Sequence, residues 1–469
     1  MFSRPVLLST QDPRSTSNAM SVEEHQQPPP PSFAVDPANF TDVPSIDLPY
    51  GFGIQSVDET LVPTPASILK YQKAPTTPFK KPDPAPPPGV LAKFKGVFVG
   101  PGFNTIFRPS GPYNRNLAAQ NKDLSETKFV VLDKDALQTA GVPDDNILEL
   151  NLTQESLSFS KPVGAVPNRG LEPQPDIVLL GVPYLQHVRD VTNPNTGRAD
   201  DTGRDIHFEP GLFMHVPASI DPDFPASICR MASIPHGTTI NALGKAPTTE
   251  KQGAPNIRPV SIVPTSTTNP NAPRPNFPSL KVDAVNSARL PQDLTKFCEQ
   301  GTITEEILKD PNTILRKINK TLGDQILSTT TFIVETPSTQ FSAKAGPGNI
   351  PFLAGTKDKQ NANVTKMSAI FWVETVQYTI QVPDMRAGDT LTLTPTDLPP
   401  GSKLPQFQVK PDKALKAGSL KVTATQIQYS QTVVLTFGTL DWPHVSVASL
   451  VPYDPVPVES SLLDSLKLY

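Results

Sequence analysis

After its first 88 residues the chain consists of short runs rich in Val, Ile, Phe and Thr, separated by clusters of Pro, Gly, Asn and Asp. In the run Met367–Val382, Tyr378 and Ile380 alternate with the polar residues Thr379 and Gln381. Alternation with a period of two places one side of a strand in the core and the other toward solvent. The pattern therefore predicts antiparallel strands with one apolar face.

About ten such runs are expected to form strands, and most follow each other without a helix between them. A flat sheet of this many strands would expose edges that pair with other chains, which favours a closed barrel or a sandwich. We predict an all-β dominated fold, a single large antiparallel β-barrel with a ligand cavity. The expected strands are Phe94–Phe107, Ile147–Phe159, Asp176–Val188, Asp205–Val216, Ser227–Ala242, Thr330–Gln340, Met367–Val382, Asp389–Thr394, Ser419–Tyr429 and Gln431–Val447.

One helical insertion is expected at about residues 291–328. Thr302 and Glu305 have the spacing of a capping box, which marks a helix start. After Pro311, apolar residues recur at helical spacing and predict one apolar stripe. The stripe would pack on the barrel as a lid or plug, or the helices would simply bridge two parts of the barrel. The stripe consists of Ile314, Leu315, Ile318, Leu322 and Ile326.

Residues 1–88 contain the proline runs Gln26–Pro31 and Lys81–Pro88 and no sustained apolar period. Proline lacks a backbone donor and favours extended conformations, so an extended N-terminal arm without its own core is predicted. The expected domains are this arm (1–88), the barrel (89–455) and a C-terminal tail (456–469). The arm could also reach a neighbouring subunit and form a homo-oligomer.

Composition narrows the possible partners. The 469 residues include 41 basic and 45 acidic ones, for a net charge of −4, and no block of like charge follows the chain, so nucleic acid is not expected as a partner. No stretch approaches the roughly 18 to 20 apolar residues of a membrane span, and the N-terminus does not resemble a secretory signal. We expect a soluble, cytoplasmic protein. Cys229 and Cys298 lack partners at metal-ligand spacing, so neither a disulfide framework nor a zinc site is expected.

The most distinctive run is Phe94–Pro109, in which Gly96, Gly100 and Gly102 lie within one strand. Glycine in a strand allows a sharp bend and a close approach to the backbone. These glycines predict a corner of the barrel wall.

This run resembles the first strand of nitrobindin-type barrels, relatives of the fatty-acid-binding and lipocalin-like (calycin) barrels. Phe98 stands where that family has Trp. Ile206–Phe213 resembles the family's His-x-Glu-Ser-Gly-aromatic strand, with Pro210 in place of Ser, and Trp442–Val445 resembles its C-terminal Pro-His segment. The matching residues of the first strand are Gly96, Gly100, Gly102, Phe103, Thr105 and Ile106.

The resemblance implies a haem b held by His444 through Nε2 as the axial metal ligand. Thr105, Phe103 and Trp442 would then lie around the haem. A neutral imidazole suits this role, and such a barrel would bind gas or carry a haem-dependent peroxidase or isomerase-type activity. Alternatively, His444 is only a turn residue after Pro443.

Three further residues are candidates for acid–base chemistry. His207 and Glu209 share one face of a strand, so they can form a hydrogen-bonded pair that works as an acid or base or only satisfies itself. His236 lies at a bend beside Gly237, which makes it a candidate distal residue of a haem pocket. A single metal ion held by His207, Glu209 and His236 is also chemically reasonable.

Two other functions stay open at this stage. One is a calycin-like carrier of an apolar small molecule, such as a fatty acid or terpenoid, without haem. The other is a structural or interaction barrel that uses the proline-rich arm. The turn Gly346–Pro351 could rim a pocket, although turns of Gly and Pro need no function.

Overall fold

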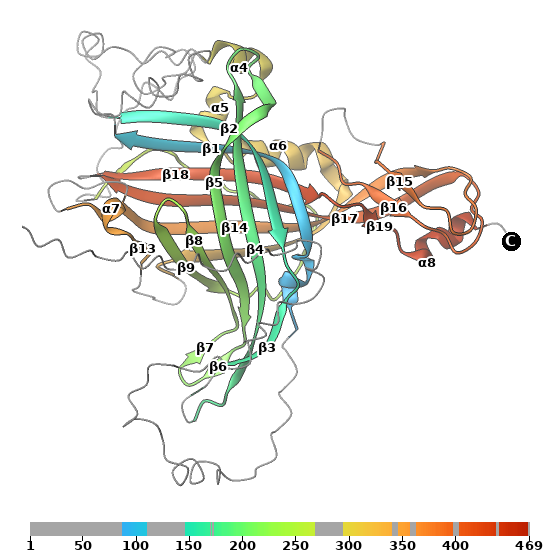
Figure 1. The fold of residues 1–469 in the computed structure, drawn as a ribbon, viewed down its shortest axis with the longest axis horizontal. Helices are drawn as coiled ribbons and strands as arrows, with labels where there is room; N and C mark the ends of the chain where they lie inside the picture. The colour runs from blue at the N-terminus through green and yellow to red at the C-terminus, as the bar shows by residue number, and fades with distance from the viewer. Residues whose placement is uncertain are drawn as a thin grey trace, which may run out of the picture. The chain divides into compact units, whose positions relative to one another are not determined.

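The computed structural model describes residues 87–109, 146–168, 170, 173–267, 294–339, 346–356, 363–396, 403–437 and 440–467 (Figure 1). These all belong to the second of two compact units, residues 81–469. The predicted arm lies outside the described residues except for its last two positions. The elements are η3 (Gly89–Lys93), β1 (Gly96–Pro109), β2 (Asn146–Phe159), β3 (Val163–Asn168), β4 (Ile177–Asn193), β5 (Arg198–Val216), β6 (Ser219–Ile220), β7 (Asp223–Phe224), β8 (Ser227–Ile234), β9 (Thr238–Lys245), β10 (Lys251–Gln252), β11 (Thr265–Ser266), α4 (Thr295–Gln300), α5 (Glu305–Lys309), α6 (Thr313–Leu322), η7 (Gly323–Gln325), β12 (Ile326–Thr336), β13 (Gly348–Asn349), α7 (Pro351–Ala354), β14 (Asn363–Val382), β15 (Leu391–Leu393), β16 (Phe407–Val409), β17 (Gly418–Phe437), β18 (Leu440–Pro452), β19 (Val456–Pro457), α8 (Ser460–Leu463) and η8 (Asp464–Leu466).

Ten antiparallel strands form a closed barrel in the order β12, β14, β17, β18, β1, β2, β4, β5, β8 and β9. The ring closes where β9 meets β12, with Leu243 opposite Glu335. The predicted all-β fold with a closed wall of about ten antiparallel strands is thereby confirmed.

Two structural details complete this closure. A Cβ on Gly244 would lie only 1.6 Å from the backbone oxygen of Ile333, so the two backbones can approach here only because residue 244 is glycine. Beyond the end of β12, the side chain of Asn349 in β13 bonds to both backbone groups of Val364, at 2.8 Å and 3.1 Å. Asn349 also accepts a bond from Thr238 at 3.0 Å, so β13 joins β9 to β14.

Two glycines of β1 allow a close approach to the backbone. A Cβ on Gly100 would lie 2.0 Å from the backbone oxygen of Ser449, and one on Gly102 would lie 2.6 Å from that of Val447, whereas nothing lies within 4 Å of a Cβ on Gly96. What approaches Gly100 and Gly102 is therefore the backbone of β18, and the corner that the three glycines predict stays a prediction.

All ten barrel strands contribute apolar side chains to one interior cluster, and η3 adds Val90 and Leu91 to it. All six of its phenylalanines pack ring against ring. The ring centroids of Phe94 and Phe159 are 4.6 Å apart, and those of Phe332 and Phe371 are 5.0 Å apart. Packing of this kind fills space at nearly crystalline density. This half of the barrel interior is therefore a core made of side chains.

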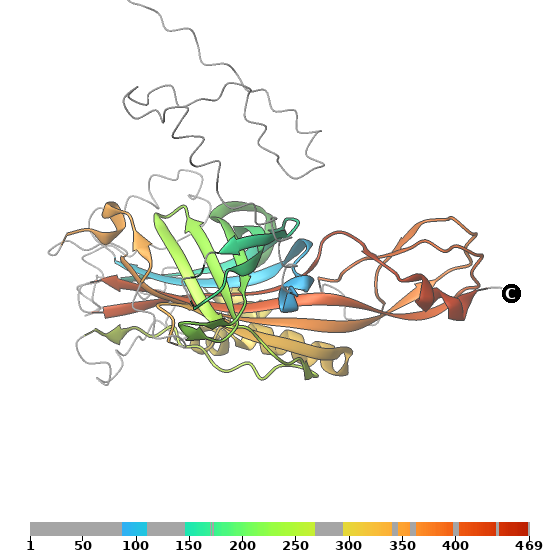
Figure 2. The same cartoon turned by 90° about the horizontal axis from the view of Figure 1, so that it is seen from below.

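The helical insertion packs on the outer face of the barrel wall (Figures 1 and 2). Phe297 of α4, Ile307 of α5 and Leu315 of α6 lie in one buried cluster with Phe103 of β1 and Trp372 of β14. Of the predicted stripe, Leu315 lies in this cluster, whereas Leu322 and Ile326 lie in a second core. The helices pack on the outside of the barrel, and their expected role as a plug is wrong.

The predicted capping box is wrong in detail. Gly301, at φ +69°, ends α4, and Glu305 is already the first residue of α5, so the N-cap is Thr304. The Thr304 hydroxyl accepts from the backbone N–H of Ile307 at 3.3 Å. Thr302 instead donates to the backbone oxygen of Gly197 at 2.6 Å.

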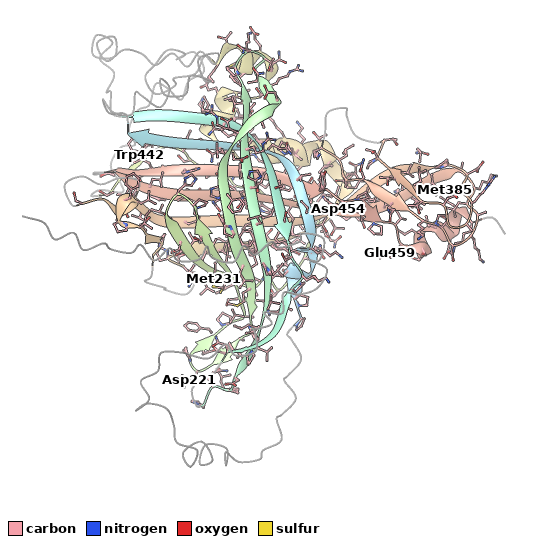
Figure 3. All side chains as sticks on the ribbon, in the orientation of Figure 1. Asp221, Met231, Met385, Trp442, Asp454 and Glu459 are labelled. Atoms are coloured by element: carbon pink, nitrogen blue, oxygen red, sulfur yellow. The ribbon has the colours of Figure 1, made fainter. Side chains whose placement is uncertain are left out.

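Strands β14 and β17 continue past the barrel into a second, smaller core (Figure 1). Met385, labelled in Figure 3, lies in this extension together with Phe407 and Leu463. The predicted strand Asp389–Thr394 forms β15 of a separate three-stranded sheet here, not a barrel strand. The segment predicted as a tail contributes β19, which pairs with β16, and α8, whose Leu463 is fully buried.

Two predicted strands have different boundaries in the structure. Ser227–Ala242 is split into β8 and β9 by the turn around His236 and Gly237, and Gln431–Val447 covers the end of β17 and the start of β18. No helix in the part of the chain that the structure describes has the length and hydropathy to cross a membrane.

Candidate functional site

A buried ion pair lies inside the barrel beside the aromatic core. Arg230 of β8 and Glu209 of β5 are 2% and 0% exposed, and Arg230 Nη2 donates to Glu209 Oε1 at 2.7 Å. The Tyr184 hydroxyl also donates to Glu209 Oε1 and accepts from Arg230 Nε, the latter at 2.9 Å. Charges this deeply buried are tolerated only when they are paired and hydrogen-bonded.

The guanidinium of Arg230 is also enclosed by rings. It lies 5.6 Å from the ring centroid of Tyr184, 5.8 Å from that of Phe213 and 5.7 Å from that of Phe371. Arginine is well suited to such contacts because its planar group is weakly hydrated. Arg230 therefore connects the aromatic half of the interior to a polar layer.

The polar layer continues to a second buried carboxyl group. Arg230 donates to the Gln186 side chain at 3.1 Å, and Gln186 donates to Glu155 Oε1 at 2.9 Å. The Tyr429 hydroxyl donates to Glu155 Oε2 at 2.6 Å. Burial raises the pKa of Glu155 to about 7, although these hydrogen bonds and the charge of Arg230 oppose the shift. Glu155 is therefore close to half protonated at neutral pH.

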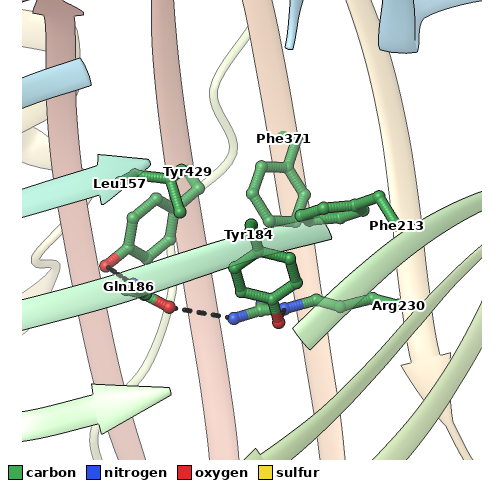
Figure 4. A pocket seen from close by; sticks show the side chains of 7 residues that line it. All are labelled: Leu157, Tyr184, Gln186, Phe213, Arg230, Phe371 and Tyr429. Carbon is green, nitrogen blue, oxygen red and sulfur yellow. Dashed lines mark hydrogen bonds between the residues drawn. The ribbon is translucent and has the colours of Figure 1, made fainter. Parts of the chain in front are cut away.

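A void of about 10 Å³ remains between these side chains, which Figure 4 shows together with the bonds of Gln186 to Arg230 and Tyr429. This volume holds about one water molecule, whereas sites for small organic ligands measure roughly 300 to 1,000 Å³. We therefore place no apolar guest in this part of the barrel. The lining residues are Leu157, Tyr184, Gln186, Phe213, Arg230, Phe371 and Tyr429.

His207 lies next along β5 from the ion pair. Its Nε2 is 3.1 Å from Glu209 Oε2, so the pairing that the shared strand face suggested is present. Burial alone would raise the pKa of Glu209, but the Arg230 guanidinium and the bonds from His207 and Tyr184 outweigh it and hold that pKa at about 2. Glu209 is thus ionised at neutral pH and orients the His207 imidazole with Nε2 as donor.

Two more imidazoles lie near His207. The ring of His236, at the exposed turn between β8 and β9, is 5.7 Å from that of His207 and nearly parallel to it. His444 of β18 is half-buried on the same face of β18 as Ala448, which belongs to the interior core. Burial, with His207 and His236 close by, lowers the pKa of His444 to about 3, and burial also lowers that of His236. We call His207, His236 and His444 the histidine cluster.

Asn104 of β1 holds His444 in place. Its Nδ2 is 2.6 Å from His444 Nε2 and 2.8 Å from the Ser446 hydroxyl. Since His444 is neutral at physiological pH, its Nε2 accepts this bond and its Nδ1 carries the proton. No pattern in the sequence indicated this role of Asn104.

The remaining predicted cofactor residues lie elsewhere. Phe103 and Thr105 of β1 are fully buried. Thr105 pairs with Val445 of β18. Val445 follows His444 in the chain and belongs to the cluster that faces the helices. Adjacent strand residues point to opposite faces, so Thr105 and His444 lie on opposite sides of the wall. Trp442 is likewise in the cluster that faces the helices. The structure therefore brings His207, Glu209, His236 and His444 together and places the other three apart from them.

The residues present were compared with the needs of a metal ion and of haem. Among the described residues, no three His, Cys, Asp or Glu side chains are close enough to hold a metal ion, so the site of His207, Glu209 and His236 is not formed. Haem iron needs one neutral imidazole from the protein, and His444 fits this chemistry because its low pKa keeps it unprotonated. In this structure the Nε2 atom of His444 is occupied by its bond to the Asn104 amide.

The sequence reasoning missed Arg230, Tyr184 and Glu155. Ile228, Arg230 and Ala232 alternate in β8, so a lone arginine on an apolar strand face was the available signal of a buried ion pair. The turn at Gly346 does line an open groove of about 530 Å³, on the outer face of the barrel beside Leu212 and Met231.

Comparisons with known proteins do not assign the chain to a family. No protein-family model matches it, and no curated protein does. One solved structure, Rv2717c from M. tuberculosis, is 10% identical in an alignment that covers 79% of this chain and 100% of that one. The TM-score of 0.28 is too low for the likeness to bear on fold or function.

Proposed function

We propose that this protein is a haem-binding β-barrel whose site is the histidine cluster, with His444 as the axial ligand. The observation that carries the proposal is that imidazoles far apart in the sequence, on β5, the β8–β9 turn and β18, lie near one another. His207 and His444 are on the interior face of their strands, and His236 is at the exposed turn. One of them, His444, is kept neutral by its surroundings. Neutral imidazole is the form that ligates iron.

The resemblance to nitrobindin-type barrels supports this ligand over others. The three segments that carry it, Phe94–Pro109, Ile206–Phe213 and Trp442–Val445, include Asn104, His207 and His444. These three residues lie in or beside the histidine cluster. A bound haem would supply the iron that binds a gas or reacts with peroxide.

The protein's own residues would then have distinct tasks. His444 provides the ligating nitrogen, and Asn104 holds that nitrogen until the ligand enters. Glu209 keeps His207 in one tautomer, with Nδ1 free of the proton and able to accept one. Arg230 keeps Glu209 ionised, which maintains this orientation across the physiological pH range.

An absorption spectrum tests the proposal. Adding haemin to the purified protein should give an intense Soret band distinct from that of free haemin, and His444→Ala should lose it. His187→Ala is the matched control, because His187 pairs with Asp205 at 2.8 Å on a half-exposed surface and should leave the band intact. The proposal would be contradicted if wild-type protein gave no Soret band, or if His444→Ala bound as much haemin as wild type.

A further inference from the structure

A third buried carboxyl group, outside the histidine cluster and its polar layer, lies between the barrel wall and the helical layer. Glu374 of β14 is 0% exposed. Two residues of β14 lie beside it on the same strand face. Trp372 belongs to the apolar cluster under α4 to α6, and Val376 belongs to the apolar core of the extension. Glu374 thus lies in a polar layer between two apolar clusters.

Helix α6 docks on this layer through one side chain. Asn319 of α6 donates from Nδ2 to Glu374 Oε1 at 2.9 Å, and Gln426 of β17 donates to Glu374 Oε2 at 2.5 Å. Asn319 Oδ1 in turn accepts from Gln428 at 2.9 Å. Asn319 is 6% exposed, so this contact is excluded from solvent.

Every group that faces Glu374 is uncharged. α6 presents Asn319, β17 presents Gln426, and β12 places Thr329 directly opposite Glu374. The charged residues Arg316 and Lys317 of α6 are paired with Asp310 and Glu306. On β18, Ser449 reaches the layer only through Gln428.

A buried carboxylate without a cation is unstable, so such a group keeps its proton. Burial raises the pKa of Glu374 to about 7, although the bonds from Gln426 and Asn319 oppose the shift. Both oxygens of Glu374 accept amide N–H bonds in the structure. When one of them carries the proton it donates, and the Gln426 amide accepts that bond by turning its oxygen toward Glu374.

We propose that Glu374 is a pH-dependent clasp, which holds α6 and the helical layer on the barrel while it is protonated and releases them when it ionises. The helical layer would then be the part of the barrel that loosens first as the pH rises from mildly acidic to neutral. This inference is independent of haem.

The direction follows from proton linkage. The pKa of Glu374 is raised in the docked state and ordinary, about 4.5, when α6 is undocked. The docked state therefore holds the proton more tightly. Docking is strongest below about pH 4.5, weakens as the pH rises toward 7 and changes no further above it.

Hydrogen exchange of the backbone amides of α6 tests the clasp in the full-length protein. After correction for the intrinsic pH dependence of exchange, protection of α6 should fall about 10- to 100-fold between pH 5 and pH 8, since each unit of pKa shift is a tenfold change. In Glu374→Gln, which keeps the shape and cannot ionise, protection should not depend on pH. Unchanged α6 protection in wild type, or the same pH slope in Glu374→Gln, would overturn the proposal.

Glu155→Gln is the matched control, because Glu155 is also buried with a pKa of about 7 but lies inside the barrel. It should leave the pH slope of α6 as in wild type. If Glu374→Gln does not fold, infrared difference spectra of Glu155→Gln provide the second test. A carbonyl stretch from a protonated carboxyl group should disappear near pH 7, and its absence at pH 5 would contradict the clasp.

Discussion

Replacing Arg230 by methionine should lower the free energy of unfolding by about 3 to 5 kcal/mol. Methionine fills most of the volume between Tyr184 and Phe213, so the main loss is electrostatic. Glu209 would remain 0% exposed without its cation. Breaking one side of a buried pair costs more than removing both, because the remaining charge stays desolvated. Urea denaturation at pH 7 measures the loss.

The double variant Glu209→Gln with Arg230→Met is the control for this explanation. It removes both charges and should recover a large part of the lost stability. If the double variant is as unstable as the sum of the two single variants, the ion pair is not the cause. The pH dependence of stability tests the same explanation. The pKa of Glu209 lies below its ordinary value of 4.5, so the stability that the ion pair contributes is present above pH 4.5 and is lost as the pH falls toward 2.

Among the described glycines, replacement by alanine should be most destabilising at Gly244. The added methyl group should lower the free energy of unfolding by about 3 kcal/mol or more. The added Cβ would lie 1.6 Å from the backbone oxygen of Ile333, and neither backbone can move without separating β9 from β12. This is the seam at which the barrel closes, opposite Leu243 and Glu335. Thermal unfolding and near-ultraviolet circular dichroism would report the loss of the closed core.

Gly346→Ala is the matched control for the seam. Gly346 precedes β13, has no positive φ, and its Cβ would meet only Thr365 O at 3.8 Å. The expected change is within about 0.5 kcal/mol. Equal stability of Gly244→Ala and Gly346→Ala would show that the barrel does not close through β9 and β12 as described.

The barrel could be predicted because the patterns that indicate its strands lie within short stretches of sequence. The alternation in Met367–Val382 indicates, within a few residues, which face of the strand is buried. The glycines of Phe94–Pro109 indicate in the same local way where the backbone can be approached closely. The errors came where alternation continues through a turn, as at His236 between β8 and β9. The extension around Phe407 was missed because short strands paired outside the barrel look the same in sequence as barrel strands.

The candidate site was predictable only in part for the same reason. His207 and Glu209 are two residues apart on one strand, so their contact followed from the strand period. The approach of His236 and the hold of Asn104 on His444 depend on which strands are neighbours in the ring. Thr105 was assigned to the same pocket as His444, yet the pairing of Thr105 with Val445 puts it on the opposite face of the wall.

Haemin titration of wild type and Asn104→Ala, followed by absorbance, tests the central claim most directly. If His444 Nε2 is the ligand that Asn104 now occupies, removing the amide should free that nitrogen and tighten haemin binding several-fold, on the scale of one lost hydrogen bond of roughly 0.5 to 1.5 kcal/mol. Weaker or unchanged binding by Asn104→Ala, while wild type still gives the Soret band, would show that haem does not bind through this nitrogen.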